Sequence, residues 1–168
     1  ERILYEHSPE YVEFERVPVK YNPDAYDINV DKMLDKVFCH DKEVRALFEE
    51  MLGYCLIKNT KYQKGFMFYG SGANGKSTVL NMIREFLGPE NVANVDLTKL
   101  HENYAAAELE NKLANLGDDI DYGKLKETGI IKKLFSGDAI LTRRIYGEPF
   151  NLYNHAKMIF ATNELPYS

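Results

Sequence analysis

Residues 70–78 read GSGANGKST, and their types and spacing suit the binding of phosphate groups. Within them, the pattern G-x-x-x-x-G-K-[ST] is complete. Glycines let a backbone turn tightly and approach phosphate oxygens, and the N–H groups at the start of a following helix attract the anion. In this pattern Lys76 contacts the β and γ phosphates, Ser77 is a ligand of Mg²⁺, and Thr78 lies near the α phosphate. We therefore predict a nucleoside triphosphate site made by Gly70, Ser71, Gly72, Ala73, Asn74, Gly75, Lys76, Ser77 and Thr78.

A phosphate loop of this kind needs a strand before it and a helix after it. Residues 65–69 form a short apolar run of strand length. From residue 76 onward the apolar residues fall on one helical face, and Gly88 and Pro89 are typical stop signals. That face consists of Val79, Leu80, Ile83 and Leu87. Strand, loop and helix are therefore predicted in the required order.

Two further apolar runs end in polar residues, at 112–119 and 157–163. Helical stretches are expected between the strands, roughly over 103–111 and 124–135. Strands that alternate with helices favour a parallel sheet covered on both faces. The predicted fold class is therefore α/β, with a parallel sheet flanked by helices.

The polar residues at these strand ends could complete a hydrolytic site. Asp118 is assigned to the Mg²⁺ shell and Asp119 to polarising the attacking water, because such sites pair a metal ligand with a group that orients water. The alternative is an acidic turn, since Asp121 is close by and aspartate is common in turns. Asn163 could hold the attacking water or sense the loss of phosphate without adding charge.

The first 60 residues differ in character from the rest. Residues 7–25 are rich in proline, asparagine, aspartate and tyrosine, and are expected to be extended chain and turns. A short helix is expected near 29–38. A second one, capped by Asp41, should bury Val44, Leu47, Phe48, Met51, Leu52 and Cys55. We predict a small, mainly helical N-terminal subdomain over 1–60 and an ATPase-like core over 61–168.

The net charge of −5 argues against a protein that coats nucleic acid. Residues 124–144, however, carry six basic side chains against two acidic ones, and residues 139–153 resemble two short strands around a Gly-Glu-Pro turn. Such a stretch suits contacts with a nucleic-acid backbone, and an aromatic ring there could stack on a base. The alternatives are a solvated basic face, or arginines that pair with acidic residues of a neighbouring subunit. The candidate DNA contacts are Lys132, Lys133, Arg143, Arg144 and Tyr146.

Several classes of protein are disfavoured. The apolar runs are short, so no membrane segment is expected, and the N-terminus does not resemble a secretory signal. Cys39 and Cys55 have no metal-like spacing and no obvious partners, so both are expected to be small buried hydrophobic residues in a reducing, cytoplasmic setting.

Taken in order, GSGANGKST, LANLGDDI, KKLFSGDAILTRRIYGEPF and FATNELP closely resemble the superfamily 3 helicase module found at the C-terminal end of phage and plasmid primases. The resemblance covers nearly the whole chain. It implies an AAA+-like core that binds ATP and Mg²⁺ and assembles into a ring, usually a hexamer, around DNA, and that unwinds it in the cytoplasm of a bacterial host. Single-stranded or forked DNA would be the substrate.

The same resemblance assigns roles to individual residues. Lys76 and Ser77 match the Walker A positions, and Asn163 matches the sensor 1 asparagine. Asp118 and Asp119 match the Walker B pair. The region that resembles the family's DNA-gripping β-hairpin contains Lys132, Lys133, Gly137, Asp138, Arg143 and Arg144.

One part of the family pattern is missing. The family places an arginine finger beyond the sensor asparagine, whereas this sequence ends five residues after Asn163. An arginine finger can contribute several orders of magnitude in rate, so we expect this chain alone to hydrolyse ATP slowly and to be a fragment of a primase-helicase. The alternative function is a nucleotide-gated module that binds or loads DNA without unwinding it. A small-molecule kinase is disfavoured because the basic stretch resembles a hairpin and not a lid.

Overall fold

The structure is a computed structural model that describes residues 5–6, 8–71, 75–102, 104–117 and 128–163. The described helices are α1 (Ile28–Val37), α2 (Lys42–Cys55), α3 (Lys76–Leu87) and α4 (Thr128–Ser136), with single 3₁₀ turns at η1 (Pro89–Asn91), η2 (Leu97–Lys99) and η3 (Ala106–Leu109). The described strands are β1 (Phe66–Tyr69), β2 (Val92–Ala93), β3 (Ala114–Gly117), β4 (Ala139–Arg143), β5 (Pro149–Tyr153) and β6 (Lys157–Thr162). In the described part of the chain, no helix combines the length and apolar character needed to span a membrane.

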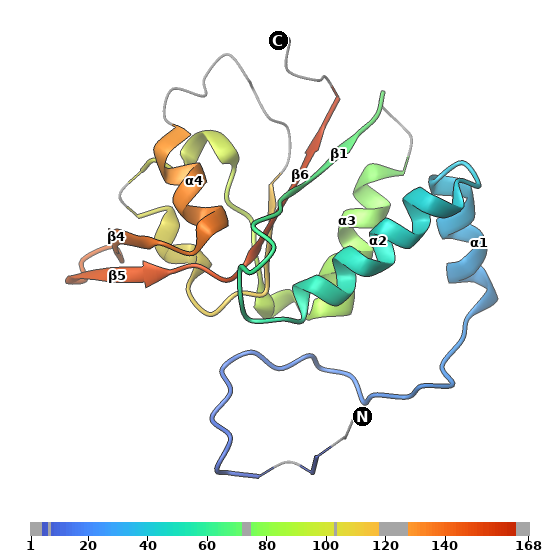
Figure 1. The fold of residues 1–168 in the computed structure, drawn as a ribbon, viewed down its shortest axis with the longest axis horizontal. Helices are drawn as coiled ribbons and strands as arrows, with labels where there is room; N and C mark the ends of the chain where they lie inside the picture. Colours follow the sequence, from blue (N-terminus) through green and yellow to red (C-terminus); the bar gives the residue numbers. More distant parts are fainter. Residues whose placement is uncertain (1–4, 7, 72–74, 103, 118–127, 164–168) are drawn as a thin grey trace.

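Four of the strands form a parallel sheet in the order β1-β6-β3-β2. Figure 1 shows α1, α2 and α3 on one side of β1 and β6, and α4 with the β4–β5 hairpin on the other side. The structure therefore confirms the α/β class and the parallel sheet flanked by helices.

Both faces of this sheet are buried. Ile159 and Ala161 of β6 belong to a hydrophobic cluster shared with α1, α2 and α3, whereas Met158 and Phe160 belong to a second cluster shared with α4 and the hairpin. All six residues of β6 are buried. Burial on both faces explains why this strand reads as a continuous apolar run and not as an alternating one.

The two N-terminal helices form where the sequence predicts them. The carboxylate of Asp41 accepts hydrogen bonds from the N–H groups of Glu43 and Val44, at 3.0 and 3.1 Å, so the predicted cap is confirmed. Phe48 is buried as expected, with Met51 and Cys55. These residues pack in the same cluster as α3 and the sheet. The boundary at residue 60 stays a prediction.

Three parts of the expected pattern are wrong. Cys39, which was expected to be buried, is exposed because it lies in the tight turn between α1 and α2, with a left-handed φ of 52°. Val44 and Leu47 are 44% and 55% exposed, because their side of α2 faces a groove and not the core. The helix expected over 103–111 is, within the described residues, a single 3₁₀ turn at η3. Its residues Ala106 and Leu109 reach the second cluster within that one turn, and Asn111 then adopts a left-handed backbone with φ of 56°.

A buried asparagine extends the sheet beyond β2. The carboxamide of Asn115 accepts a hydrogen bond from the N–H of Val95 at 2.8 Å and donates one to the Val95 carbonyl at 2.9 Å. Asn115 is fully buried. Its amide therefore replaces a neighbouring strand's backbone and satisfies two backbone groups that would otherwise be buried without partners.

A buried lysine lies at the start of β6. The Nζ of Lys157 donates hydrogen bonds of 2.6 Å to the carbonyl oxygens of Ile57 and His155, and it lies 4.5 Å from the centre of the Tyr54 ring. Burial lowers the pKa of Lys157 to about 8. The side chain thus joins the end of α2 to the sheet, although its charge is disfavoured there.

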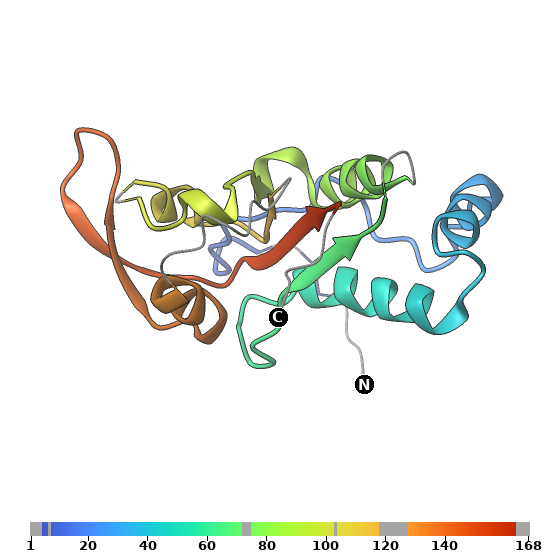
Figure 2. The ribbon, with the colours of Figure 1, turned by 90° about the horizontal axis from the view of Figure 1, so that it is seen from above.

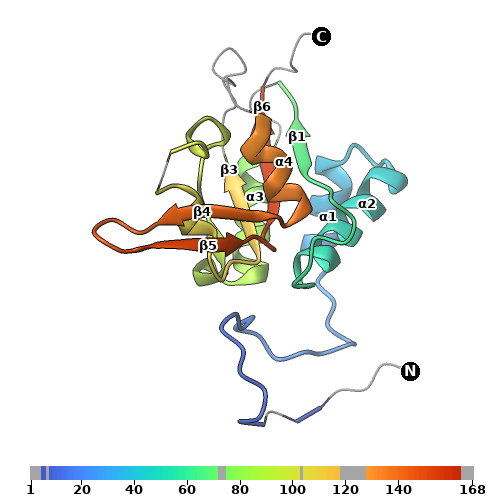
Figure 3. The same cartoon turned by 60° about the vertical axis from the view of Figure 1, so that its left-hand side comes forward.

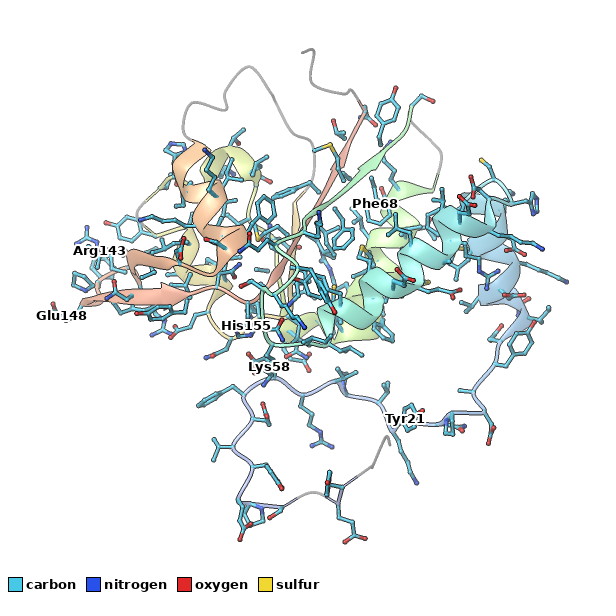
Figure 4. All side chains as sticks on the ribbon, in the orientation of Figure 1. Tyr21, Lys58, Phe68, Arg143, Glu148 and His155 are labelled. Atoms are coloured by element: carbon cyan, nitrogen blue, oxygen red, sulfur yellow. The ribbon has the colours of Figure 1, made fainter. Side chains whose placement is uncertain are left out.

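The segment before α1 has no helix or strand within its described residues, as predicted. It is anchored through Glu15, whose carboxylate lies 2.5 Å from the Nζ of Lys58 and 2.9 Å from the Nε2 of His155. Figure 4 shows Lys58 and His155 facing this segment, with Tyr21 farther from the body. Burial raises the pKa of Glu15, but hydrogen bonds from Lys58 and its other partners outweigh burial and leave the pKa below its usual value.

Candidate functional site

The phosphate loop begins at the carboxyl edge of the parallel sheet. Tyr69 pairs with Thr162 in the β1–β6 register, and the N–H of Gly70 donates a hydrogen bond of 3.3 Å to the carbonyl of Thr162. Figures 1 and 2 show β1 and β6 side by side, and the exposed Asn163 directly follows β6. The structure therefore brings the start of the loop and Asn163 to the same edge, as the sequence predicts for parallel strands.

The end of the loop requires glycine. Gly75 is the N-cap of α3 and has a φ of +85°, a left-handed conformation that other residues rarely adopt. A Cβ at Gly75 would also lie 3.0 Å from Cγ2 of Val37, at the end of α1. This position is therefore restricted both by backbone conformation and by contact with the neighbouring helix.

The first turn of α3 carries the groups expected to bind phosphate and metal. Lys76 is half-buried and its Nζ donates a hydrogen bond back to the carbonyl of Gly70, across the loop. Ser77 and Thr78 are exposed. Since the first turn of α3 contains no acidic residue, its positive end is not offset by a local carboxylate. Gly72, Ala73 and Asn74 lie outside the described residues.

The acidic pair of the prediction, Asp118 and Asp119, also lies outside the described residues. The strand that precedes it ends at Gly117, which pairs with Phe160 of β6. A Cβ at Gly117 would lie 2.6 Å from Cδ1 of Phe160 and 3.1 Å from the carbonyl of Val95. Close packing therefore requires glycine at the last residue of β3.

The donors on α3 fit a magnesium nucleotide. The exposed hydroxyl of Ser77 follows the cation of Lys76, at the start of a helix that has no side-chain cap among the described residues. A hydroxyl ligand for the metal, with a cation and a helix N-terminus for the phosphates, is the set of groups that such a ligand needs. Among the described residues, no cluster of three or more histidine, cysteine, aspartate or glutamate side chains could hold a metal by itself. A metal here would therefore depend on Ser77, the nucleotide and the predicted aspartates.

The basic stretch forms the predicted hairpin of β4 and β5, which projects from the body in Figure 3. Its two arginines contact the same chain. Arg143 donates a hydrogen bond of 2.5 Å to the hydroxyl of Tyr104, and its guanidinium lies 4.9 Å from the centre of that ring. Arg144 pairs with Glu110 and lies 5.5 Å from the centre of the Phe150 ring.

The other candidate DNA contacts are open to solvent. Tyr146 lies in the hairpin turn with a φ of +61° and is fully exposed. Lys132 and Lys133 are exposed on α4. Gly137, between α4 and β4, has a φ of +76°, and a Cβ there would lie 2.6 Å from Oγ1 of Thr60. This glycine is therefore required by the turn that starts the hairpin.

Sequence reasoning missed the partners of the two arginines. Tyr104 precedes Arg143 by 39 positions, and Glu110 precedes Arg144 by 34. No local pattern signals pairs so far apart. Acidic partners on a neighbouring subunit are one alternative that the sequence leaves open, whereas the structure supplies Glu110 of the same chain as the partner of Arg144.

The chain matches a family of unknown function, DUF5906, over residues 68–168. The protein named "Putative helicase L207/L206" of Acanthamoeba polyphaga mimivirus is 28% identical over 145 residues, which cover 82% of this chain and 15% of the viral protein. The apo structure of the NrS-1 C-terminal region has a TM-score of 0.69 at 16% identity, covering 96% of this chain and 38% of that one. A JCV helicase structure has a TM-score of 0.52 at 14% identity, covering 88% of this chain and 43% of that one. The chain thus spans less than half of each of these proteins.

Proposed function

The chain belongs to the DUF5906 family, whose function is unknown, and we propose that it is the ATP-binding core of a DNA helicase of the superfamily 3 type. The observation that carries this proposal is the arrangement at the carboxyl edge of the sheet. Gly75, with its left-handed backbone, caps a helix whose first residues are Lys76 and Ser77. The loop that leads to this helix starts beside the end of β6, which Asn163 follows. The similarity to a viral protein named as a helicase supports the same reading.

Several different groups at this edge of the sheet would bind the phosphates. The Nζ of Lys76, now on the carbonyl of Gly70, is within reach of the loop and can move onto β and γ phosphate oxygens. The first-turn N–H groups of α3 add dipoles directed at the same anion. Bound Mg²⁺ would neutralise the charge that develops on the phosphates, with Ser77 and Asp118 as its protein ligands.

We propose that Asn163 and Asp119 position and polarise the water that attacks the γ phosphate. Asn163 is exposed at the strand end next to the loop, and as a neutral amide it can orient water without adding charge. Asp119 is proposed as the group that polarises this water, on the order of motifs in the sequence. An arginine from a neighbouring subunit would complete the site in a ring, usually a hexamer.

The hairpin is the proposed DNA contact, through the phosphate backbone. Tyr146 is exposed at its turn, and Lys132 and Lys133 are exposed on the adjoining helix. Arg144, however, is paired with Glu110. DNA phosphates must therefore compete with this carboxylate for the arginine.

The function is tested by ATP hydrolysis in the full-length protein, with and without a forked DNA duplex. Wild-type turnover should rise with DNA, and Lys76→Ala should reduce it by about 100-fold, since the lost cation acts on developing phosphate charge. Lys32→Ala, an exposed lysine on α1, is the matched control and should leave turnover unchanged. Equal turnover in the wild type and Lys76→Ala would refute the proposal. ATP-dependent DNA binding without strand displacement would instead establish the nucleotide-gated loading module.

The hairpin assignment has its own test. Arg144→Gln should weaken DNA binding and reduce its salt dependence, whereas Glu110→Gln should strengthen binding about three-fold by releasing the arginine. If DNA affinity is the same in both variants and the wild type, Arg144 does not contact DNA.

A further inference from the structure

The helices before the phosphate loop contact the chain at both of the loop's described ends. At the start, Phe68 of β1 lies two residues before Gly70, and the centre of its ring is 6.2 Å from that of Phe48 on α2. Figure 4 shows Phe68 on the side of β1 that faces the helices. At the end, the methyl groups of Val37, the last residue of α1, would lie 3.0 and 3.7 Å from a Cβ added to Gly75. The α1–α2 pair therefore packs against the strand that enters the loop and against the residue that leaves it.

The place of Val37 depends on how α1 is attached to α2. The chain reverses between the two helices in a tight turn, in which Cys39 and His40 have left-handed φ angles of 52° and 60°. Beside this turn, the ring centres of Phe38 and Phe48 lie 5.0 Å apart. These contacts fix the point at which α1 ends. The direction of the helix from that point requires a second contact farther along it.

Arg45 of α2 makes this second contact. Its guanidinium pairs with the carboxylates of Asp31 and Asp35, which lie one turn apart on α1. Its Nη1 also donates a hydrogen bond of 3.4 Å to the carbonyl oxygen of Asp31. A guanidinium is a rigid planar fork of donors, so it can hold two acceptors of one helix in a fixed arrangement. Arg45 thus sets the direction of α1 relative to α2.

The charges of this contact are stabilised by the pairing itself. Hydrogen bonds from Arg45 hold the pKa of Asp31 below its usual value, and hydrogen bonds to Asp31, Asp35 and Glu49 raise the pKa of Arg45. The side chain of Arg45 is 23% exposed, and partly buried pairs are screened by salt less than exposed ones. Surface ion pairs contribute little to folding stability. The loss of Arg45 should therefore change the direction of α1 more than the stability of the chain.

We propose that Arg45 is a positioning residue for nucleotide binding, which acts by holding α1 so that Val37 packs against Gly75. This inference rests on the proposed function of the loop. Gly75 has no Cβ and could adopt many backbone conformations, but the N–H groups that follow it bind phosphate only when they point toward the anion. Contact with Val37 restricts Gly75 before the ligand arrives. A loop that is ordered in advance binds more tightly, because less conformational freedom is lost on binding.

The test measures phosphate affinity in variants of the two positioning residues. The chain is titrated calorimetrically with the magnesium complex of inorganic tripolyphosphate, which carries phosphates without a base. Arg45→Gln removes the charge but keeps a long side chain with a high helix propensity. Val37→Ala removes the methyl groups that approach Gly75. Each variant should bind about five-fold more weakly than the wild type, because the loop must then be ordered by the ligand.

The double variant shows whether Arg45 acts through Val37. Effects that act by one route do not add, so Arg45→Gln/Val37→Ala should also bind about five-fold more weakly, whereas independent effects would multiply to about 25-fold. Glu49→Gln is the matched control, because it removes a partner of Arg45 within α2 and leaves the pairs with α1 in place. It should bind tripolyphosphate as tightly as the wild type does. Guanidinium unfolding of every variant defines conditions under which each is folded.

The possible results separate the positioning role from the function of the loop. Wild-type affinity for tripolyphosphate in either single variant overturns the positioning role. A loss of about 25-fold in the double variant overturns the route through Val37. Equal losses in Glu49→Gln and Arg45→Gln overturn the role of the contact between α1 and α2. Wild-type protein that is folded and binds neither tripolyphosphate nor magnesium ATP refutes the proposed function itself.

Discussion

The buried Lys157 makes the stability of this protein depend on pH in a direction that can be calculated. Burial lowers its pKa from 10.5 to about 8. Below pH 8 the lysine is charged in both the folded and the unfolded chain, so its unfavourable burial is fully present. Between pH 8 and 10.5 the folded chain loses this proton and the unfolded chain keeps it. The free energy of unfolding therefore rises with pH over this range, by up to about 1.4 kcal/mol per pH unit.

The buried Cys55 changes the free energy of unfolding in the opposite direction as the pH rises. Burial raises the pKa of its thiol from 9.0 to about 12, so from pH 9 upward only the unfolded chain loses this proton and stability falls. Between pH 7 and 9, Lys157 contributes a gain of about 1.4 kcal/mol and Cys55 a loss of about 0.4 kcal/mol. The expected net gain is about 1 kcal/mol.

The assay is guanidinium unfolding followed by circular dichroism at pH 7, 8 and 9, in the wild type and in Lys157→Met. Methionine removes the titrating group and also the hydrogen bonds to two buried carbonyls, so the two effects on absolute stability oppose each other. The diagnostic quantity is therefore the change in the free energy of unfolding with pH. The wild type should gain stability between pH 7 and 9, and Lys157→Met should not. Lys99→Met, which replaces an exposed lysine, should behave like the wild type. If Lys157→Met has the same slope as the wild type, the account of Lys157 is refuted.

Three further changes test the packing of the sheet and its N-terminal anchor. Asn115→Leu should lower the free energy of unfolding by about 2–4 kcal/mol in denaturant titrations, because two backbone groups of Val95 lose their partners; an unchanged value would contradict this role. Gly117→Ala should cost about 1–3 kcal/mol, since its Cβ would overlap the ring of Phe160, and a stabilised variant would show that the strand end can relax. Glu15→Gln should speed limited proteolysis of the N-terminal segment. Since the pKa of Glu15 is lowered, its stabilising effect is present above about pH 4.5 and is lost as the pH falls through the lowered value. The free energy of unfolding should therefore fall less steeply with acidification in the variant than in the wild type.

The sequence predicted features that depend on local chemistry. Asp41 was identifiable as a cap because a carboxylate before an amphipathic run can bind the first free N–H groups of a helix, and the structure has this contact. Gly75 was identifiable because the phosphate pattern requires a backbone that only glycine adopts readily, and its φ is +85°. Both features are decided within a few residues of the chain.

Features that depend on distant parts of the chain were missed. The periodicity that placed Leu47 on a buried face cannot distinguish a core from an apolar groove, because both require the same spacing. The pair of Arg144 with Glu110 joins residues 34 positions apart, and the burial of Lys157 depends on the carbonyl of Ile57, 100 positions away. Such contacts are decided by tertiary packing, which no local pattern records.

The central claim, that residues 70–78 bind a nucleoside triphosphate, is tested most directly by binding of magnesium ATP to this chain. Calorimetric titration should show saturable binding to the wild type. Lys76→Ala should weaken it by at least about ten-fold, because a charge-assisted contact with phosphate contributes about 1.5–3 kcal/mol. The unfolding curve of the variant should match that of the wild type, since Lys76 lies at the loop and not in either hydrophobic cluster. Equal affinity in the two proteins, or no binding by folded wild-type chain, would contradict the account.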